Sequence, residues 1–269
     1  MNIKELIVAK NEYLTLKGNT LDFEKFNQYA IVHHSTSIEG STLSLDETFL
    51  LLDEQLTPKN KPLLHTLMTI DHYQALQYVV ELAQNKTKLT LSILQKISSL
   101  LLKHTGSEIS SMAGTFDSSK GDFRKTTVRA GNRTFPDYKK VPNMMVKLVN
   151  ESNIRIEKAD EYIENSKLAF DIHFQMVSIH PFADGNGRIS RLLMNYVQAY
   201  HDFPMTIIFQ EDKSEYYMAL EKTRKDENIE VFRTFMFAQA YKYLKFEIEN
   251  FRSKAKERKI DDSGFSFLF

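Results

Sequence analysis

Apolar side chains recur every three or four residues along most of this chain, which is the spacing of one face of an α-helix. The pattern is regular in the first fourteen residues, between residues 63 and 84, and from residue 229 to about 258. Polar stretches that contain glycine, asparagine, serine or proline separate the apolar runs, and such residues favour turns and helix ends. We therefore expect a mainly helical protein. The expected helices cover residues 3–14, 21–40, 44–52, 63–84, 90–101, 141–150, 160–179, 188–200, 215–220 and 229–258.

One segment departs from the helical spacing. Residues 123–135 alternate polar and apolar side chains on both sides of Gly131-Asn132, which predicts a β-hairpin. The preceding residues 105–122 are rich in serine, glycine and threonine, and we expect a surface loop there. The alternative for this pattern is a short edge hairpin that binds nothing. The predicted fold class is all-α with one small β-hairpin.

Composition narrows the class of function. Lysine plus arginine and aspartate plus glutamate both number 35, so the formal net charge is zero and nothing favours bulk attraction to nucleic acid or membrane. The chain has no cysteine, which excludes disulfides, thiolate metal sites and cysteine nucleophiles. It shows neither a signal-peptide pattern nor an apolar run of transmembrane length. We expect a cytoplasmic protein with no nucleic-acid or membrane partner.

The stretch His180-Pro-Phe-Ala-Asp-Gly-Asn-Gly-Arg-Ile-Ser-Arg191 lies between two apolar helical runs. Gly185 and Gly187 allow a tight turn that brings backbone N–H groups close to an anion. The first turn of the following helix adds unpaired N–H donors. Arg188 and Arg191 are three residues apart on one helix face, where they can bind adjacent phosphates. This stretch therefore predicts a polyphosphate site.

Two further side chains of the stretch suit phosphate chemistry. Asp184 offers a hard oxygen ligand for Mg²⁺, which usually accompanies a polyphosphate. His180 is the side chain here that can take a proton near neutral pH. A base, a metal ligand, an anion-binding turn and two arginines together indicate phosphoryl or nucleotidyl transfer.

The same stretch resembles the signature of the Fic family, H-x-F-x-[D/E]-G-N-[G/K]-R-x-x-R, and matches every specified position. The resemblance implies a helical Fic fold and an enzyme that transfers AMP from ATP, with Mg²⁺, to a protein hydroxyl. Many relatives carry an asparagine at the position of Arg224 and use it to contact the base of the nucleotide. The nucleotide preference of this chain therefore stays open. The resemblance implies catalytic roles for His180, Asn186, Arg188 and Arg191, a metal-binding role for Asp184, and nucleotide contacts from Gly185, Asn186, Gly187, Arg188, Arg191 and Tyr217.

A second short motif lies upstream, at Ser35-x-x-x-Glu39-Gly40. Glu39 falls at the expected end of a helix, where the helix dipole disfavours a negative charge. The motif resembles the inhibitory motif of Fic proteins, [S/T]-x-x-x-E-[G/N]. The resemblance implies that Glu39 pairs with Arg191 and occupies space that the γ-phosphate needs. The alternative is an ordinary solvated glutamate at a helix end.

The expected hairpin resembles the Fic flap, which lies over the active site and holds the target segment by backbone pairing. Thr126, Thr127 and Val128 are the candidates for that pairing. We expect an N-terminal helical region over residues 1–104 that carries the inhibitory helix at about 21–40, a Fic core over 105–258 with the flap at about 123–135 and the C-terminal helices, and an apolar tail over 259–269.

The expected function is that of an autoinhibited protein adenylyltransferase that modifies a Tyr, Ser or Thr hydroxyl of a target protein and of itself. Two alternatives remain open. The first is a Fic protein that transfers another phosphate-linked group or removes AMP from a modified protein. The second is a nucleotide-binding regulator without turnover. The sequence identifies no target, and the apolar tail is compatible with a homo-oligomer.

Overall fold

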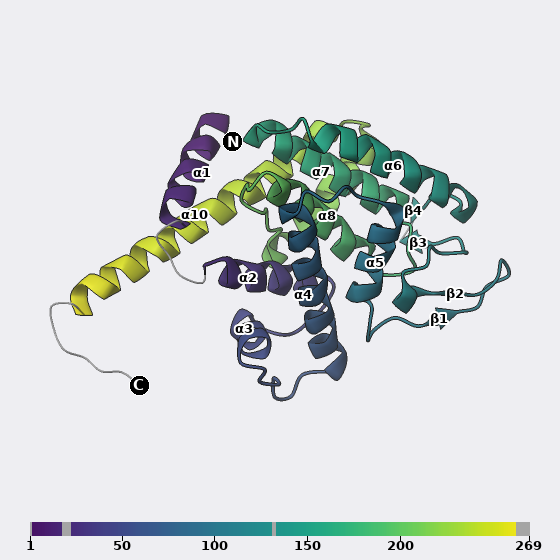
Figure 1. Ribbon diagram of the computed structural model, residues 1–269, viewed down its shortest axis with the longest axis horizontal. Coiled ribbons are helices and arrows are strands. Elements are labelled where there is room, and N and C mark those ends of the chain that lie inside the picture. Colours follow the sequence, from purple (N-terminus) through teal and green to yellow (C-terminus); the bar gives the residue numbers. More distant parts are fainter. Residues whose placement is uncertain (1, 18–22, 131–132, 262–269) are drawn as a thin grey trace.

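The computed structural model describes residues 2–17, 23–130 and 133–261. It shows a body of packed helices with two small hairpins at one side (Figure 1). The predicted fold class, mainly helical with a small β-hairpin, is confirmed. The helices are α1 (Ile3–Lys17), α2 (Phe23–Ile38), α3 (Leu45–Asp53), α4 (Leu63–Gln84), α5 (Leu91–Leu101), α6 (Val141–Ile156), α7 (Tyr162–Ile179), α8 (Asn186–Tyr200), α9 (Lys213–Lys225) and α10 (Ile229–Asp261).

The stretch expected to be a loop at 105–122 contains a hairpin, so this expectation was wrong. Strand β1 (Glu108–Ile109) pairs antiparallel with β2 (Phe116–Asp117), and a turn of 3₁₀-helix follows at Ser118–Lys120. The serine side chains explain the error. The Ser118 hydroxyl accepts from the backbone N–H of Ser107 at 2.9 Å and donates to its carbonyl at 3.0 Å, so serine completes the pairing in this segment.

The predicted flap hairpin forms from β3 (Arg129–Ala130) and β4 (Arg133–Thr134), which pair antiparallel. Its turn residues, 131–132, lie outside the described residues. The strands are shorter than the alternating pattern over 123–135 suggested. The predicted tail, residues 259–269, also lies largely outside the described residues, which end at Asp261 in α10.

Helix α8 passes through the centre of the protein and positions the predicted phosphate site. It packs against α7 and α4, and most of its residues are buried. The Asn165 side-chain amide of α7 donates to the carbonyl of Val197 in α8 at 3.1 Å and also to that of Ala159. The loop between α7 and α8 therefore joins two helices that cannot shift independently.

The N-terminal helices belong to the same core. Helix α1 packs along α10, and α2 packs against α4 and reaches α8 (Figure 1). The predicted boundary at residue 104 therefore does not separate two independent cores, and it stays a sequence-based prediction. None of the helices in the described part of the chain is long and apolar enough to cross a membrane.

The end of α2 directs Glu39 toward α8. The helix ends at Ile38, which is fully buried, and Gly40 follows with φ of 102°, a conformation that favours glycine. The backbone N–H of Ser41 closes the turn by donating to the carbonyl of Thr36 at 3.0 Å. Gly40 therefore forms the C-terminal cap of α2.

We predict that Asp171→Ala destabilises the fold by about 2 kcal/mol. Asp171 on α7 accepts two hydrogen bonds from Arg233 on α10, at 2.8 and 2.7 Å, and one from Arg155 on α6 at 3.1 Å. Charged hydrogen bonds of this kind contribute about 1.5–3 kcal/mol, and Arg155 is too exposed to add much. Urea denaturation measures the change. Asp160→Ala, at an exposed aspartate before α7, is the control, and an equal loss in both variants would contradict the prediction.

Candidate active site

The loop that follows α7 begins with a left-handed residue. His180 has φ of 53° and ψ of 59° and caps α7, with its backbone N–H donating to the carbonyl of Met176 at 3.0 Å. The Asn186 side chain closes the loop: its Oδ1 accepts from the N–H of Phe182 and its Nδ2 donates to the Phe182 carbonyl, both at 3.0 Å. Asn186 thus fixes the loop through its side chain, and a direct contact with phosphate oxygens stays a prediction.

Arg188 is buried, and some of its N–H donors make no hydrogen bond with the described residues. Its guanidinium is 3.4 Å from the Asp184 carboxylate, and its Nε and Nη1 have no hydrogen-bond partner among the described residues. Burial lowers the pKa of Arg188 below its ordinary value. Buried N–H donors without partners are costly, and an anionic ligand would satisfy them.

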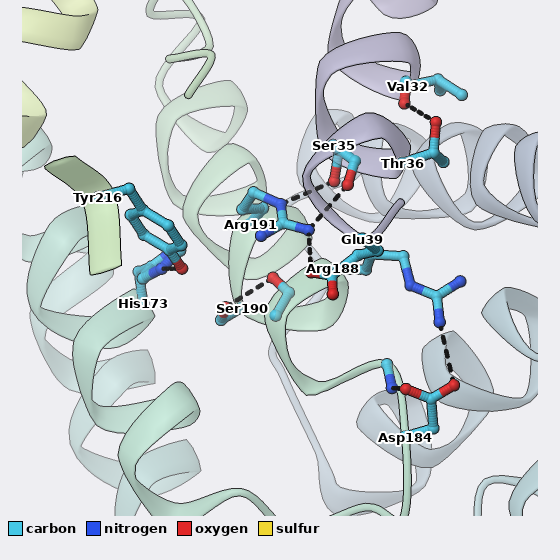
Figure 2. Close-up of polar contacts among 12 residues, drawn as sticks. Val32, Ser35, Thr36, Glu39, His173, Asp184, Arg188, Ser190, Arg191 and Tyr216 are labelled. Carbon is cyan, nitrogen blue, oxygen red and sulfur yellow. Dashed lines mark hydrogen bonds and ion pairs between the residues drawn. The ribbon is translucent and has the colours of Figure 1, made fainter. Parts of the chain in front are cut away.

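Arg191, one turn further along α8, is bonded to the end of α2. Figure 2 shows its guanidinium directed at Ser35 and Glu39. Its Nε donates to Ser35 Oγ at 2.8 Å, and its Nη2 donates to the Ser35 carbonyl at 2.9 Å and to Glu39 Oε1 at 2.7 Å. The two segments, more than 150 positions apart in sequence, meet at this one guanidinium.

The Glu39 carboxylate lies against the first turn of α8. A Cβ atom added at Gly187 would be 2.6 Å from Glu39 Oε1 and 3.3 Å from Arg191 Nη1, so a side chain here would displace the carboxylate from its present position. Burial opposes ionisation of Glu39, but the charge and hydrogen bond of Arg191 outweigh it, and the pKa of Glu39 lies below its ordinary value. An anion therefore already occupies the predicted cradle, and it is the chain's own carboxylate.

The imidazole of His180 faces the same cleft in neutral form. Burial and the charge of Arg124 lower the pKa of His180 to about 4. Its ring stacks on Phe135, with centroids 3.9 Å apart and planes tilted by 22°. The cleft is lined by Glu39, Arg133, Phe135, Val177, His180, Gly187, Arg191, Tyr216, Tyr217, Leu220, Glu221 and Arg224.

The structure brings most of the predicted site residues together. Tyr217 is half-exposed in this cleft beside Arg191, and Arg224 lies in it too. The predicted target-binding residues Thr126 and Val128 already use their backbone carbonyls within the flap. The carbonyl of Thr126 accepts from Arg124, and that of Val128 accepts from the N–H of Phe135, so these two acceptors are not free for a target segment. Pairing between a target and this part of the flap stays a prediction.

Sequence reasoning missed the cationic and aromatic residues of the flap. Arg124 is 1% exposed, and Phe135 and Arg133 lie in the cleft beside His180. Arginine in an alternating polar segment is ordinarily solvent-facing, so no local signal marks Arg124 as buried. Its partners are backbone carbonyls more than fifty residues away as well as near neighbours, and these depend on tertiary structure.

The donor set fits Mg²⁺ only together with phosphate. Within the described ranges, no three His, Cys, Asp or Glu side chains gather closely enough to hold a metal ion by themselves. Asp184, however, is an exposed carboxylate beside the buried Arg188. Mg²⁺ is commonly held by one or two carboxylates plus substrate phosphates and water, so Asp184 suits that ligand role.

Comparisons with known proteins agree with this geometry. Residues 88–198 match the model of the Fic/DOC family. Over 193 residues the chain is 29% identical to the protein adenylyltransferase Fic of Nematostella vectensis, which covers 71% of this chain and 42% of that protein. The chain therefore spans less than half the length of that curated relative.

Solved structures show the same fold. A Fic domain-containing signaling protein from Bacteroides thetaiotaomicron superposes with a TM-score of 0.77 at 24% identity, covering 93% of this chain and 98% of that chain. Fic-1 from C. elegans superposes with a TM-score of 0.70 at 22% identity, covering 95% and 73%. Residues 88–198, which contain the complete signature, thus match the Fic/DOC family, and the described part of the chain has the fold of solved Fic proteins.

Proposed function

We propose that this chain is an autoinhibited nucleotidyltransferase that moves AMP from ATP to a hydroxyl side chain of a target protein and of itself. One observation carries the proposal: the neutral imidazole of His180 faces a cleft whose other side is the anion cradle of Gly187 and Arg191. The names of the curated relatives, protein adenylyltransferases, support AMP as the transferred group.

The reaction follows from these residues. Neutral His180 takes the proton of a Tyr, Ser or Thr hydroxyl while the hydroxyl oxygen forms a bond to the α-phosphorus of ATP. The bond from that phosphorus to the pyrophosphate oxygen breaks, and the N–H donors of Arg188 and Arg191 stabilise the negative charge on the leaving phosphates. When bound, Mg²⁺ held by Asp184 would neutralise phosphate charge. Asn186 keeps the loop closed, which holds the base and the anion site in fixed relation.

Autoinhibition follows from a competition for one guanidinium. Arg191 commits its Nη2 to Glu39, and that carboxylate lies against Gly187, where the first turn of α8 would otherwise receive a phosphate. A triphosphate and the Glu39 carboxylate are both negative, so they exclude each other sterically and electrostatically. The docked end of α2 thus supports the inhibitory role proposed for Ser35, Glu39 and Gly40.

We predict that Glu39→Gly raises self-modification by labelled ATP about tenfold to a hundredfold. A hundredfold block requires roughly 2.7 kcal/mol of preference for the paired state, which a charge-assisted, partly buried pair can supply. The fold should survive, since Arg191 keeps both bonds to Ser35. The matched control is Glu54→Gly, an exposed glutamate at the end of α3.

The double variant Glu39→Gly/His180→Ala tests the base. It should show no labelling above background while it still binds ATP, because base loss typically costs 10²–10⁴-fold in rate. Equal labelling of the parent and Glu39→Gly would refute autoinhibition alone. Absence of labelling in Glu39→Gly would refute nucleotidyl transfer from ATP.

We predict that the His180 imidazole stays neutral down to about pH 5 in the nucleotide-free protein. Its pKa of about 4 is set by burial and by Arg124, and an unfolded histidine titrates near 6.5. Acidification through this range therefore favours the unfolded chain. NMR titration of the eight histidines, with His180→Gln to assign the signal, measures the value. A midpoint near 6.5 would contradict a buried, neutral base.

We predict that Asp184→Ala removes most of the Mg²⁺-dependent part of ATP binding and leaves the melting temperature of the free protein unchanged. Asp184 is largely exposed, and its contact with Arg188 is long at 3.4 Å, so it adds little to folding. Thermal shifts by ATP with and without Mg²⁺, in the Glu39→Gly background, measure the effect against Asp160→Ala. The same Mg²⁺-dependent shift in both variants would exclude Asp184 as the metal ligand.

A further inference from the structure

No carboxylate in the described part of the chain bonds the proposed base, His180. In catalytic histidines the second ring nitrogen usually bonds a carboxylate or carbonyl that fixes the ring. Among the described residues, no side chain bonds Nδ1 of His180, and the backbone carbonyl of Val177 is the acceptor that acts on the ring. The charged groups that act on the ring are Arg124, Arg133 and Asp184. Something other than a hydrogen-bonded carboxylate must hold the ring.

The flap supplies that hold through Phe135. The Phe135 ring is 6% exposed and lies almost parallel to the imidazole at 3.9 Å. The guanidinium carbon of Arg133 lies 4.2 Å from the centre of the same ring. Two groups at these distances cannot share one face, so Phe135 is sandwiched between His180 and Arg133. Arg133 in turn donates to the carbonyl of Ser178 at 3.3 Å, which anchors the stack to α7.

Arg124 holds the backbone of His180. Its Nε donates to the carbonyl of His180 at 2.7 Å, its Nη1 to that of Thr126 at 2.7 Å, and its Nη2 to that of Pro136 at 2.6 Å. Thr126 precedes the hairpin and Pro136 follows it, so one guanidinium joins both stems of the flap to the base. A planar fork with several donors can do this, whereas the point charge of lysine cannot.

The burial of Arg124 has a cost that its bonds only partly offset. Burial lowers the pKa of Arg124, and no carboxylate is among its hydrogen-bond partners. A buried guanidinium that bonds only carbonyls is a weak source of stability. What it provides is a fixed geometry between the two stems and the carbonyl of His180.

We propose that the flap orients the catalytic base, with Phe135 and Arg124 as positioning residues that hold the ring and the backbone of His180. The inference rests on the proposed function. The segment that would receive the acceptor also sets the direction of the base, so the hydroxyl and the imidazole are aligned by one element. Neither residue is needed to bind the phosphates, because Arg188 and Arg191 are the proposed phosphate ligands.

The effect of releasing the ring should fall on the chemical step. A misplacement of about 1 Å at a reacting group can cost on the order of a hundredfold. In the Glu39→Gly background, we expect Phe135→Leu to lower kcat about tenfold to a hundredfold and to change KM for ATP less than twofold. Phe135→Tyr keeps the ring and should retain most of the activity. Arg124→Lys keeps the charge without the fork and should lower kcat in the same range.

Phe123→Leu is the matched control. Phe123 belongs to the same segment and packs on Phe182 with centroids 5.3 Å apart, and it takes no part in the stack on His180. The substitution is the same in size and chemistry. A loss that arises from general loosening of the flap should appear equally in both leucine variants.

A second readout requires no activity. NMR titration of His180 should show its pKa rising toward the ordinary value in Phe135→Leu, because the ring gains access to water, and staying low in Phe123→Leu. If Glu39→Gly transfers no AMP, the proposed function fails, and this titration still decides whether the flap holds the base. The inference is overturned if Phe135→Leu and Phe123→Leu agree in both kcat and His180 titration. It is also overturned if Phe135→Leu and Arg124→Lys lose ATP binding along with kcat.

Discussion

The positive charge buried at the start of α8 is the constraint on which this structure depends. Arg188 and Arg191 are both 3% exposed, and they lie where the helix dipole adds further positive potential. Two guanidinium groups so placed need an anion, and the Glu39 carboxylate supplies one at 2.7 Å from Arg191. The Nε and Nη1 donors of Arg188 have no partner among the described residues and could bind a further anion.

Burial, together with nearby arginines, lowers the pKa of the histidines around this site. His72 and His173 are fully buried, and burial and the nearby arginines hold the pKa of each well below its usual value. His180 lies further out, yet burial and a third arginine keep its pKa low as well. A second positive charge in this region would be costly, so each imidazole is held neutral. The proposed general base must be neutral, and at His180 burial and the flap arginines Arg124 and Arg133 lower the pKa of the ring.

Features with a local cause could be predicted from the sequence. The helices follow from apolar spacing, and the tight loop before α8 follows from the glycines and Asn186, whose bonds reach only to Phe182. The signature placed His180 and Arg191 in one site because they lie on the two ends of one short connection. The position of Glu39 came from a resemblance, since nothing local in α2 specifies a partner on α8.

Features that depend on distant partners could not be predicted. The β1–β2 pair was taken for a loop because its strands are two residues long, and the Ser118 hydroxyl, not apolar alternation, extends the pairing to Ser107. Arg124 has the sequence surroundings of a surface residue, and its burial depends on carbonyls from the two stems of the flap and from His180. The stack of Phe135 on His180 likewise requires the flap to fold back over α7.

The hydrogen bonds of Arg191 are divided between Ser35 and Glu39, which bears on how firmly the proposed block would be held. Two of its three hydrogen bonds to α2 go to Ser35, which is 3% exposed and belongs to the packed helix, whereas the third goes to a carboxylate that is partly open to solvent. Rotation of the Glu39 side chain would therefore free the space beside Gly187 without undocking α2. Such a rotation breaks one charge-assisted bond, which is a smaller cost than unpacking a helix that carries the buried Ile38. Under the proposed autoinhibition, the block would be relieved by rotation of one side chain and not by unpacking of a helix.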